Sequence, residues 1–448
     1  MIKNFIRSTR LSSIALVASA SLVVSACASS EAETSSSEVV SSSSQTITWW
    51  SWDSNPVQED MIAAFNEEFP DITVEYQRFN FSDYLTALRS GLSSDSGPDV
   101  FQVAPGGMLA SYGDLAVDLA PLVSESLGAD WETLFNSTAV EQLNQDGKQV
   151  AMPTYLSAAG LIYYNQTLVE ELGIEIPGNL PEWAETCAQV NAAGYTCLTH
   201  GAAESWVNTD VFLALANSAE PGLIYDAIEG NASWTSDGLL TAMNSWEFLF
   251  TSGIVGAGAT AVTQYPDAFN SFLSSEAVFV AMGTWNTPGT QTVTGMVDSQ
   301  AGLERIIDGE FLSAPFPAVS EEVQSTLPFG GVANGWALSS RSQAPEAAFE
   351  FIKFLSAGEG QNMIGGQASF PSFLSAPVNT GDVIFPSQVA DIERQQSSLE
   401  QLVGYREIPY PDLAAAIGIA LSAVAGGTQS PAEALAALQA ASDSVDRG

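Results

Sequence analysis

The sequence predicts an α/β protein with a mainly parallel sheet, and three observations support this prediction. Short apolar or alternating runs of strand length lie at residues 47–50, 72–76 and 100–103. Apolar residues at helical spacing separate these runs. The chain of 448 residues is 46% hydrophobic and 14% charged, which suffices for a large core in two domains or one two-lobed unit. Strands that alternate with helices at these distances indicate crossover connections between parallel strands.

The first two predicted helices lie between these strands. Pro56 suits the first turn of a helix. Apolar residues at fourfold spacing follow it: Val57, Met61, Phe65 and Phe69. Ser82 is the predicted N-cap of the second helix. The apolar face of that helix carries three leucines: Leu85, Leu88 and Leu92. A Gly-Pro-Asp turn at residues 97–99 then leads into the third strand.

The rest of the chain continues the same pattern. Residues 161–164 predict a strand, and Pro345 opens a helix whose apolar residues include Phe349 and Ile352. Residues 413–425 and 431–445 predict two helices at the end of the chain. No repeat and no heptad array interrupts the pattern, so the predicted class stays α/β.

The charge of the chain excludes some functions. Lys and Arg number 12 against 52 Asp and Glu, which gives a formal net charge of −40. Sequence-independent binding to DNA or RNA needs a basic surface that displaces counterions. An anionic membrane surface would also repel this protein. The acidity concerns solubility and the surrounding medium rather than the fold.

The first 26 residues predict a lipoprotein signal peptide. A basic start with Lys3, Arg7 and Arg10 precedes an apolar run at 11–24 that is too short to span a membrane. The run ends in Val-Ser-Ala-Cys, which resembles the lipobox of bacterial lipoproteins and implies that Cys27 becomes the lipid-bearing N-terminus. The alternative is an ordinary secretory peptide cleaved before an incidental Cys27. No later run has the length of a membrane span.

A disordered tether is predicted at residues 27–46, before a folded part that begins near Ile47. Nine of the nineteen residues at 28–46 are serine, and such a segment cannot bury enough apolar surface to fold. With Cys27 lipidated, only Cys187 and Cys197 remain, and an exported protein is expected to join them in a disulfide. The alternative is two buried thiols. Two cysteines alone cannot form a structural zinc site.

Several segments in the same order carry a resemblance to a known family. They include ITWWSWDSNPVQEDMIAAFNEEFPDITVEYQ, SDYLTALRSGLSSDSGPDV, GLIYYNQTLVEELGIEIP, AVFVAMGTW, PFGGVANGWALSSRSQAPEAAFEFIKFL and REIPYPDLAAAIGIALSAVAGG. Together they resemble the extracellular solute-binding proteins of ABC importers, in the carbohydrate-binding family that includes maltose-binding protein. The resemblance covers residues 47–445 and is strengthened by the lipobox.

The resemblance implies a two-lobed type II periplasmic-binding-protein fold with a ligand cleft between the lobes. Three hinge crossings are expected near residues 153–160, 330–333 and 405–411. The first lobe would comprise 47–155 and 332–406, and the second 156–331 and 407–448. Gly330 and Gly331 suit a hinge because glycine tolerates large changes in backbone angles.

A sugar site needs flat aromatic rings for stacking and Asp, Asn or Gln for hydrogen bonds. The predicted ligand-binding residues are Trp52, Asp53, Gln102, Tyr155, Trp206, Trp285, Asn286 and Trp336. The match to the family makes Trp285 the strongest candidate for a stacking platform, with Asn286 beside it to bind a hydroxyl. Trp52 and Trp336 could instead be packing residues, Gln102 a buried strand residue and Asp53 a helix cap. Most ligand-facing positions differ from maltose-binding protein, so the sugar is not identified.

The sequence argues against an enzyme. His200 is the only histidine, so a catalytic triad or a multi-histidine metal site would depend on it. No nucleotide-binding motif stands in a strand-to-helix context, no EF-hand loop is present, and we expect neither cofactor nor metal. With 52 acidic residues in the chain, pairs of carboxylates arise by chance, so their spacing does not indicate a catalytic site.

The predicted function is a monomeric, lipid-anchored protein on the outer side of the cell membrane that binds a carbohydrate and delivers it to ABC permease subunits. The same fold could bind a polyamine, a metal chelate or a phosphate ester. Abundant aromatic residues and the lack of arginine near the candidate loops argue against an anionic ligand. A surface glycosidase or adhesin is the remaining alternative.

Overall fold

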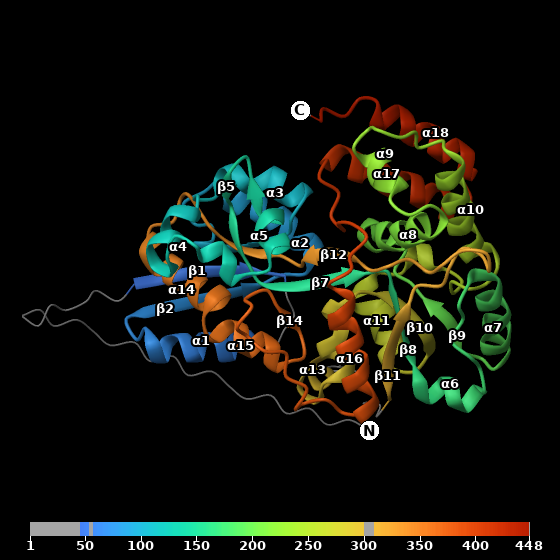
Figure 1. The fold of residues 1–448 in the computed structure, drawn as a ribbon, viewed down its shortest axis with the longest axis horizontal. Coiled ribbons are helices and arrows are strands. Elements are labelled where there is room, and N and C mark those ends of the chain that lie inside the picture. Colours follow the sequence, from blue (N-terminus) through green and yellow to red (C-terminus); the bar gives the residue numbers. More distant parts are fainter. Residues whose placement is uncertain (1–44, 53–56, 300–308, 448) are drawn as a thin grey trace, which may run out of the picture. The chain divides into compact units, whose positions relative to one another are not determined.

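The computed structural model describes residues 45–52, 57–299 and 309–447 (Figure 1). The predicted signal peptide, Cys27 and most of the predicted tether lie outside the described residues, as do Asp53 and Pro56. The first strand already begins at Gln45, so the folded part starts two residues earlier than predicted.

The first lobe is built on a five-stranded sheet in the order β2-β1-β3-β13-β6. Its strands are β1 (Gln45–Ser51), β2 (Ile72–Arg78), β3 (Val100–Val103), β6 (Ala151–Pro153) and β13 (Gly335–Leu338). β1 pairs in parallel with β2 and β3, whereas β13 is antiparallel to β3 and β6. One strand therefore runs against the other four, and the mainly parallel sheet is as predicted.

Helices and two short strands complete this lobe. They are α1 (Val57–Glu68), α2 (Phe81–Gly91), α3 (Gly107–Tyr112), α4 (Ala120–Leu127), α5 (Ser137–Gln142), β4 (Asn144–Gln145), β5 (Lys148–Gln149), α14 (Pro345–Ala357) and α15 (Glu359–Gly366). Trp49 of β1 is fully buried, and its ring lies 5.0 Å from Phe351 of α14 and 5.1 Å from Trp336 of β13. Phe349 and Ile352, the apolar residues predicted for this helix, are buried in the same core as Trp49.

The prediction for α2 is wrong in two details. The helix begins at Phe81 after Asn80, so Ser82 lies inside its first turn rather than at the N-cap. The buried side chains are Tyr84 and Leu88 of the helix and Leu92 at its C-cap, while Leu85 is only partly buried. Because residues four apart lie on one helix face, Tyr84 completes the buried row in place of Leu85.

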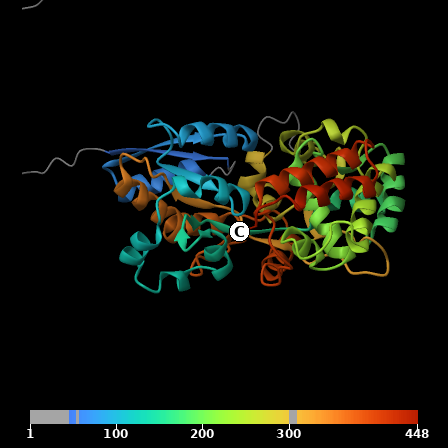
Figure 2. The same cartoon turned by 90° about the horizontal axis from the view of Figure 1, so that it is seen from above.

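The second lobe is built on a four-stranded sheet in the order β11-β8-β10-β9. Its strands are β8 (Leu161–Asn165), β9 (Thr196–Thr199), β10 (Ala277–Met282) and β11 (Phe311–Pro315). Its helices are α6 (Gln166–Leu172), α7 (Leu180–Ala192), α8 (Ser205–Ala219), α9 (Leu223–Ile228), α10 (Asp237–Thr251), α11 (Phe269–Leu273), α12 (Thr287–Gln291), α13 (Val293–Ser299), α16 (Pro386–Ser398), α17 (Pro411–Ala425) and α18 (Pro431–Ser442). The last two helices, red in Figure 2, lie side by side and pack with α8 and α10.

Helix α16 differs from the prediction, which placed it in the first lobe. The buried carboxylate of Asp391 accepts hydrogen bonds from the backbone N–H and the hydroxyl of Ser313 on β11, both at 2.9 Å. Gln388 Nε2 donates to the carbonyl of Phe311 at 3.1 Å. These long-range bonds attach α16 to the sheet of the second lobe.

A third, small sheet joins strands from two of the predicted crossing segments to a short strand at residues 370–371. It has the order β12-β7-β14, with β7 (Tyr155–Ala159), β12 (Phe329–Val332) and β14 (Phe370–Pro371). β7 leads directly from the first sheet to the second, and it is antiparallel to β12 (Figure 1). The Gly330 N–H donates to the carbonyl of Gly404 at 2.8 Å. Residues 155–159, 329–332 and 404 therefore lie next to one another.

We expect Gly330→Ala to lower the free energy of unfolding by roughly 1–3 kcal/mol. A Cβ at this position would lie 2.2 Å from the Ser157 carbonyl oxygen and 2.9 Å from the Ala158 Cα, both backbone atoms that cannot rotate away. Gly366→Ala is the control, because a Cβ there meets no heavy atom of the described part of the chain within 4 Å. Urea denaturation of both variants tests this; equal stability would contradict it.

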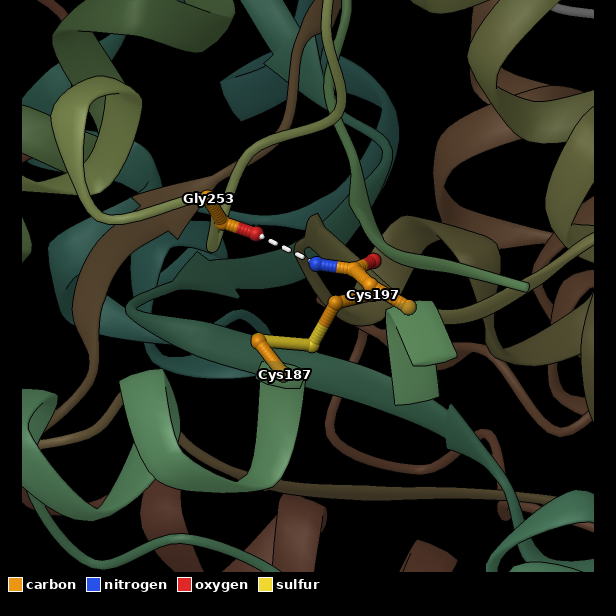
Figure 3. Close-up of a disulfide and its surroundings, with 4 residues drawn as sticks. Cys187, Cys197 and Gly253 are labelled. Atoms are coloured by element: carbon orange, nitrogen blue, oxygen red, sulfur yellow. Dashed lines mark hydrogen bonds between the residues drawn. A yellow bond between two sulfur atoms is a disulfide. The ribbon is translucent and has the colours of Figure 1, made fainter. Parts of the chain in front are cut away.

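The two remaining cysteines are joined in the second lobe. Cys187 of α7 and Cys197 of β9 are fully buried and form a disulfide with a Cα–Cα distance of 5.2 Å (Figure 3). Close to it, Asn191 Nδ2 donates to the carbonyl of Gly253 at 3.0 Å. The disulfide and this hydrogen bond connect α7, β9 and the loop after α10.

Candidate ligand-binding site

Three aromatic side chains of the second lobe form the aromatic cluster: Trp206, Tyr265 and Trp285. The rings of Trp206 and Tyr265 are stacked with centroids 6.0 Å apart and planes 11° apart. Trp285 meets Trp206 edge-on at 6.3 Å. Tyr265 is 42% exposed and both tryptophans are half-buried. Large aromatic surfaces that remain open to solvent in a folded protein mark a binding surface.

The end of β10 explains the position of Trp285. All six residues of β10 are buried, and Gly283 follows directly before the turn that contains Trp285. A Cβ on Gly283 would lie 1.9 Å from the Trp285 ring, so only glycine lets the indole fold back over the strand end. The Gly-x-Trp pattern in the sequence is therefore a requirement of packing at this turn.

Hydrogen bonds hold the rings in place. Trp285 Nε1 donates to the hydroxyl oxygen of Tyr265 at 3.1 Å, and that hydroxyl donates to Asn286 Oδ1 at 2.8 Å. The amide Nδ2 of Asn286 is buried and makes no hydrogen bond within the described part of the chain. A buried donor without a partner costs about 1–3 kcal/mol. Asn286 is thus the polar group of the cluster with unused hydrogen-bonding capacity.

Arg406 lies against this cluster. Its Cζ is 4.4 Å from the Trp285 ring centroid and 5.6 Å from that of Trp206, within the range of cation–π contact. Nε and Nη2 donate to the two carboxylate oxygens of Asp210 at 2.8 and 3.0 Å, and Nη1 donates to Glu407 at 2.6 Å. The guanidinium charge is therefore balanced by two carboxylates.

The ionisation of this pair follows from burial and proximity. Burial raises the pKa of Asp210 to about 6, although Arg406 acts in the opposite direction. Burial lowers the pKa of Arg406, but Asp210 and Glu407 raise it by more, so the guanidinium stays charged. At neutral pH both partners are ionised.

A cavity of about 670 Å³ lies beside the crossing segments. It is lined from the first lobe by Gly106, Leu109, Glu141 and Gln142, from the crossing strands by Ser157, Gly330 and Val332, and from residues 399–409 by Glu400, Tyr405, Arg406 and Glu407. Arg406 belongs to both the cavity wall and the surroundings of the aromatic cluster. The cavity and the cluster together form the candidate site.

The structure brings together three of the predicted residues, Trp206, Trp285 and Asn286. Trp52 and Gln102 lie instead at the ends of β1 and β3, where the Trp52 N–H donates to Gln102 Oε1 at 3.0 Å. The Trp52 ring is half-buried, with Tyr84 at 5.1 Å, and Gln102 is fully buried. These two residues therefore have packing contacts within the first lobe.

Two other predicted residues also pack in the first lobe. Tyr155 is half-buried on β7 and packs against the core around Trp49. Trp336 is 4% exposed and lies in that core, which corrects its assignment to the ligand site. Because successive strand residues point to opposite faces, its place in β13 turns it toward the helices. Asp53 lies outside the described residues.

Tyr265, Asp210 and Arg406 are site residues that sequence reasoning missed. Asp210 follows Trp206 by one helical turn on α8, a spacing that places both on one face and could have indicated it. Arg406 is 196 residues from Asp210 in the sequence, and no local sequence pattern predicts that the two residues pair. The expectation that no arginine lies near the candidate loops is therefore wrong.

His200 lies in the interior of the second lobe. It is 2% exposed, and its Nε2 is 2.8 Å from Asn208 Oδ1. Burial lowers the pKa of His200 to about 4, although the bond to Asn208 raises it. The ring is therefore neutral at pH 7 and is held by packing and one hydrogen bond.

The family follows from comparison with known proteins. The sequence pattern that defines the bacterial extracellular solute-binding proteins matches residues 53–362, more than half of the chain. The chain belongs to this family. Bacterial extracellular solute-binding proteins are binding proteins rather than enzymes. Within the described residues, no helix of this family member combines the length and apolar character needed to cross a membrane.

Individual relatives are distant. A binding protein of Brucella abortus (strain 2308) is 24% identical over 216 residues, which are 48% of this chain and 51% of the relative. Another, from Brucella suis biovar 1 (strain 1330), matches with the same values. The chain thus spans about half the length of the curated relatives it matches.

Solved structures of other solute-binding proteins show the same two-lobed fold. A chitin oligosaccharide binding protein superposes with a TM-score of 0.75 at 18% identity, covering 90% of this chain and 100% of its own. Maltose-bound MalE3 of T. maritima gives 0.71 at 19% identity, covering 89% and 99%. The Lmo0181 protein of Listeria monocytogenes with cycloalternan gives 0.71 at 18% identity, covering 89% and 98%. At these identities the likeness establishes the fold.

Proposed function

We propose that this solute-binding protein captures a sugar or oligosaccharide and delivers it to the permease subunits of an ABC importer. The observation that carries the proposal is the aromatic cluster beside a cavity lined from both lobes. Sugar rings present apolar C–H faces that stack on indole and phenol rings. Trp285 would be the principal platform and Trp206 a second one.

The polar groups of the site supply what a sugar hydroxyl needs. Among the described residues Asn286 Nδ2 is a buried donor without a partner, and a hydroxyl that reached it would recover the cost of its burial. Its Oδ1 already accepts from Tyr265, so the amide is oriented before a ligand arrives. A small set of oriented polar groups beside aromatic rings is the usual composition of a sugar site.

The proposed mechanism is closure of the lobes. A ligand that contacts both lobes binds the closed form more tightly than the open form and shifts the population toward it. The crossing strand β12 carries Gly330 to the cavity wall, and the segment between α16 and α17 of the second lobe carries Arg406 and Glu407 there. Closure would therefore change the site from its edge. The closed shape is what the permease would recognise.

The solved relatives support a carbohydrate as the class of ligand. The names of those proteins refer to chitin oligosaccharide, maltose and cycloalternan, which are all carbohydrates. We propose that the ligand of this chain is also a carbohydrate, and we name no particular sugar. We also propose that Cys27 carries a lipid that holds a monomer on the outer side of the cell membrane, with residues 28–44 as a tether.

A polyamine is the second candidate ligand. The described cavity wall contains the carboxylates of Glu141, Glu400 and Glu407, and its one arginine, Arg406, is already paired with two carboxylates. This arrangement suits a neutral or cationic ligand and disfavours a phosphate ester.

A thermal-shift screen of the purified chain tests both candidates. The panel would contain maltose, chitin, xylan and mannan oligosaccharides, with spermidine, amino acids and phosphate esters as comparisons. At 100 times its dissociation constant a ligand stabilises the fold by about 2.7 kcal/mol. We expect a shift with one class of sugar. A shift with spermidine alone would overturn the carbohydrate assignment, and release of shorter sugars would indicate a glycosidase.

A further inference from the structure

We propose that Arg406 is a positioning residue for the aromatic cluster. Its guanidinium, clamped by Asp210 and Glu407, holds the rings of Trp285 and Trp206 in the arrangement that binds a sugar. The inference deepens the proposed function and rests on it where sugar affinity is concerned. The claim that Arg406 holds the rings in position rests only on contacts within the ligand-free protein.

The geometry of α8 is the first support. Trp206 and Asp210 are four residues apart on this helix, so they lie one turn apart on the same face. Both contact Arg406: Asp210 through two hydrogen bonds, and Trp206 through its ring at 5.6 Å. The helix thus presents an anchor for the guanidinium and a ring for it to cover.

The shape of the guanidinium is the second support. Its edge is occupied by Asp210 and Glu407, while its Cζ lies 4.4 Å from the Trp285 ring centroid. A planar guanidinium can form a two-pronged bond at its edge and contact a ring at the same time, whereas a lysine ammonium offers one point charge. The Arg406 side chain is only 18% exposed, which strengthens both contacts.

The position of Arg406 along the chain is the third support. It stands two residues after Gly404, whose carbonyl accepts a hydrogen bond from Gly330 of β12. Its side chain lines the cavity and also reaches α8 and the turn after β10. Any shift of residues 404–406 would therefore move the guanidinium against the two tryptophans.

The test uses three variants of the full chain: Arg406→Lys, Arg406→Met and Asp210→Asn. Near-UV circular dichroism and acrylamide quenching report the environment of Trp285, whose contribution is isolated by comparison with Trp285→Phe. We expect all three variants to change the tryptophan spectrum and to make Trp285 at least twofold more accessible to quencher. Arg341→Lys is the control, because Arg341 pairs with Asp95 on the exposed surface of the first lobe.

Arg406→Lys separates positioning from charge alone. If charge sufficed, lysine would restore the wild-type spectrum and sugar affinity. We expect lysine to fail in both, with affinity for the sugar that gives a thermal shift reduced at least tenfold while the chain remains folded. An unchanged spectrum and unchanged quenching in Arg406→Lys and Arg406→Met would overturn the proposal.

A pH titration adds a measurement that a purely structural role of Arg406 would leave unchanged. Arg406 and Glu407 are the charged groups that act on Asp210, and burial raises the pKa of Asp210 to about 6. Below that pH the carboxylate gains a proton and its clamp on Arg406 weakens. We expect the wild-type tryptophan spectrum to change as the pH falls through about 6 and Asp210→Asn to lack this transition. A transition retained in Asp210→Asn would count against the proposal.

These measurements also distinguish a failure of this inference from a failure of the proposed function. The spectra, the quenching and the titration need no ligand. If no sugar binds but the variants release Trp285, the function fails and the positioning role holds. If a sugar binds and none of the variants alters the tryptophans, the positioning role fails and the function holds.

Discussion

Replacing Trp285 with alanine is expected to weaken sugar binding at least tenfold, or about 1.4 kcal/mol. The indole is half-buried at the end of β10, donates to Tyr265 at 3.1 Å and lies against Arg406. Alanine removes the stacking surface and frees the Tyr265 hydroxyl and the guanidinium together. The loss should therefore exceed that of a single contact.

Isothermal titration with the sugar found in the screen would measure this loss. Trp285→Phe keeps a ring and should retain part of the affinity. Trp50→Ala is a matched control, since Trp50 is also half-buried but packs on Phe79 and beside Gly91 in the first lobe. Unchanged affinity in Trp285→Ala, with the chain folded, would remove Trp285 from the site.

Breaking the disulfide is expected to lower the free energy of unfolding by about 2–3 kcal/mol. The bond joins residues ten positions apart, so it restricts a short loop of the unfolded chain. Neither α7 nor β9 contributes a residue to the aromatic cluster. Sugar affinity should therefore stay within twofold of wild type.

Denaturation in urea with and without reductant would measure the change. Because both cysteines are fully buried, reduction has to be carried out on the unfolded chain before refolding. A Cys187→Ala/Cys197→Ala variant is the control and should be insensitive to reductant. Two free thiols in the mass spectrum of the native protein would contradict the prediction.

Much of the fold could be predicted from the sequence because its signals are local. The strand at 72–76, the helix from Pro345 and the last two helices follow from apolar periodicity, and the structure has all of them. Errors occurred where a local signal was ambiguous. Ser82 resembles an N-cap, yet the helix starts earlier at Phe81.

The site was only partly predictable, for a different reason. Trp285 is predictable because AVFVAMGTW resembles the family's strand that ends in Gly-x-Trp. The physical reason for the glycine, the 1.9 Å that a Cβ at 283 would leave to the Trp285 ring, comes from the structure. Trp336 has similar neighbours in sequence, but its strand places it in the core beside Trp49. Which face of a strand points inward depends on partners that the local sequence does not name.

The sequence by itself determined the alternation of strands and helices in residues 47–103, the helix from Pro345, the last two helices, the acidic character of the chain, and the tryptophan at the end of β10. Only the tertiary structure decided that α16 joins the second lobe and that Arg406 meets Asp210 across 196 residues of chain. The physical reason is the range of the interactions. Periodicity and capping act within a few turns of the backbone, whereas a buried ion pair forms only where folding brings distant segments into contact and removes them from water.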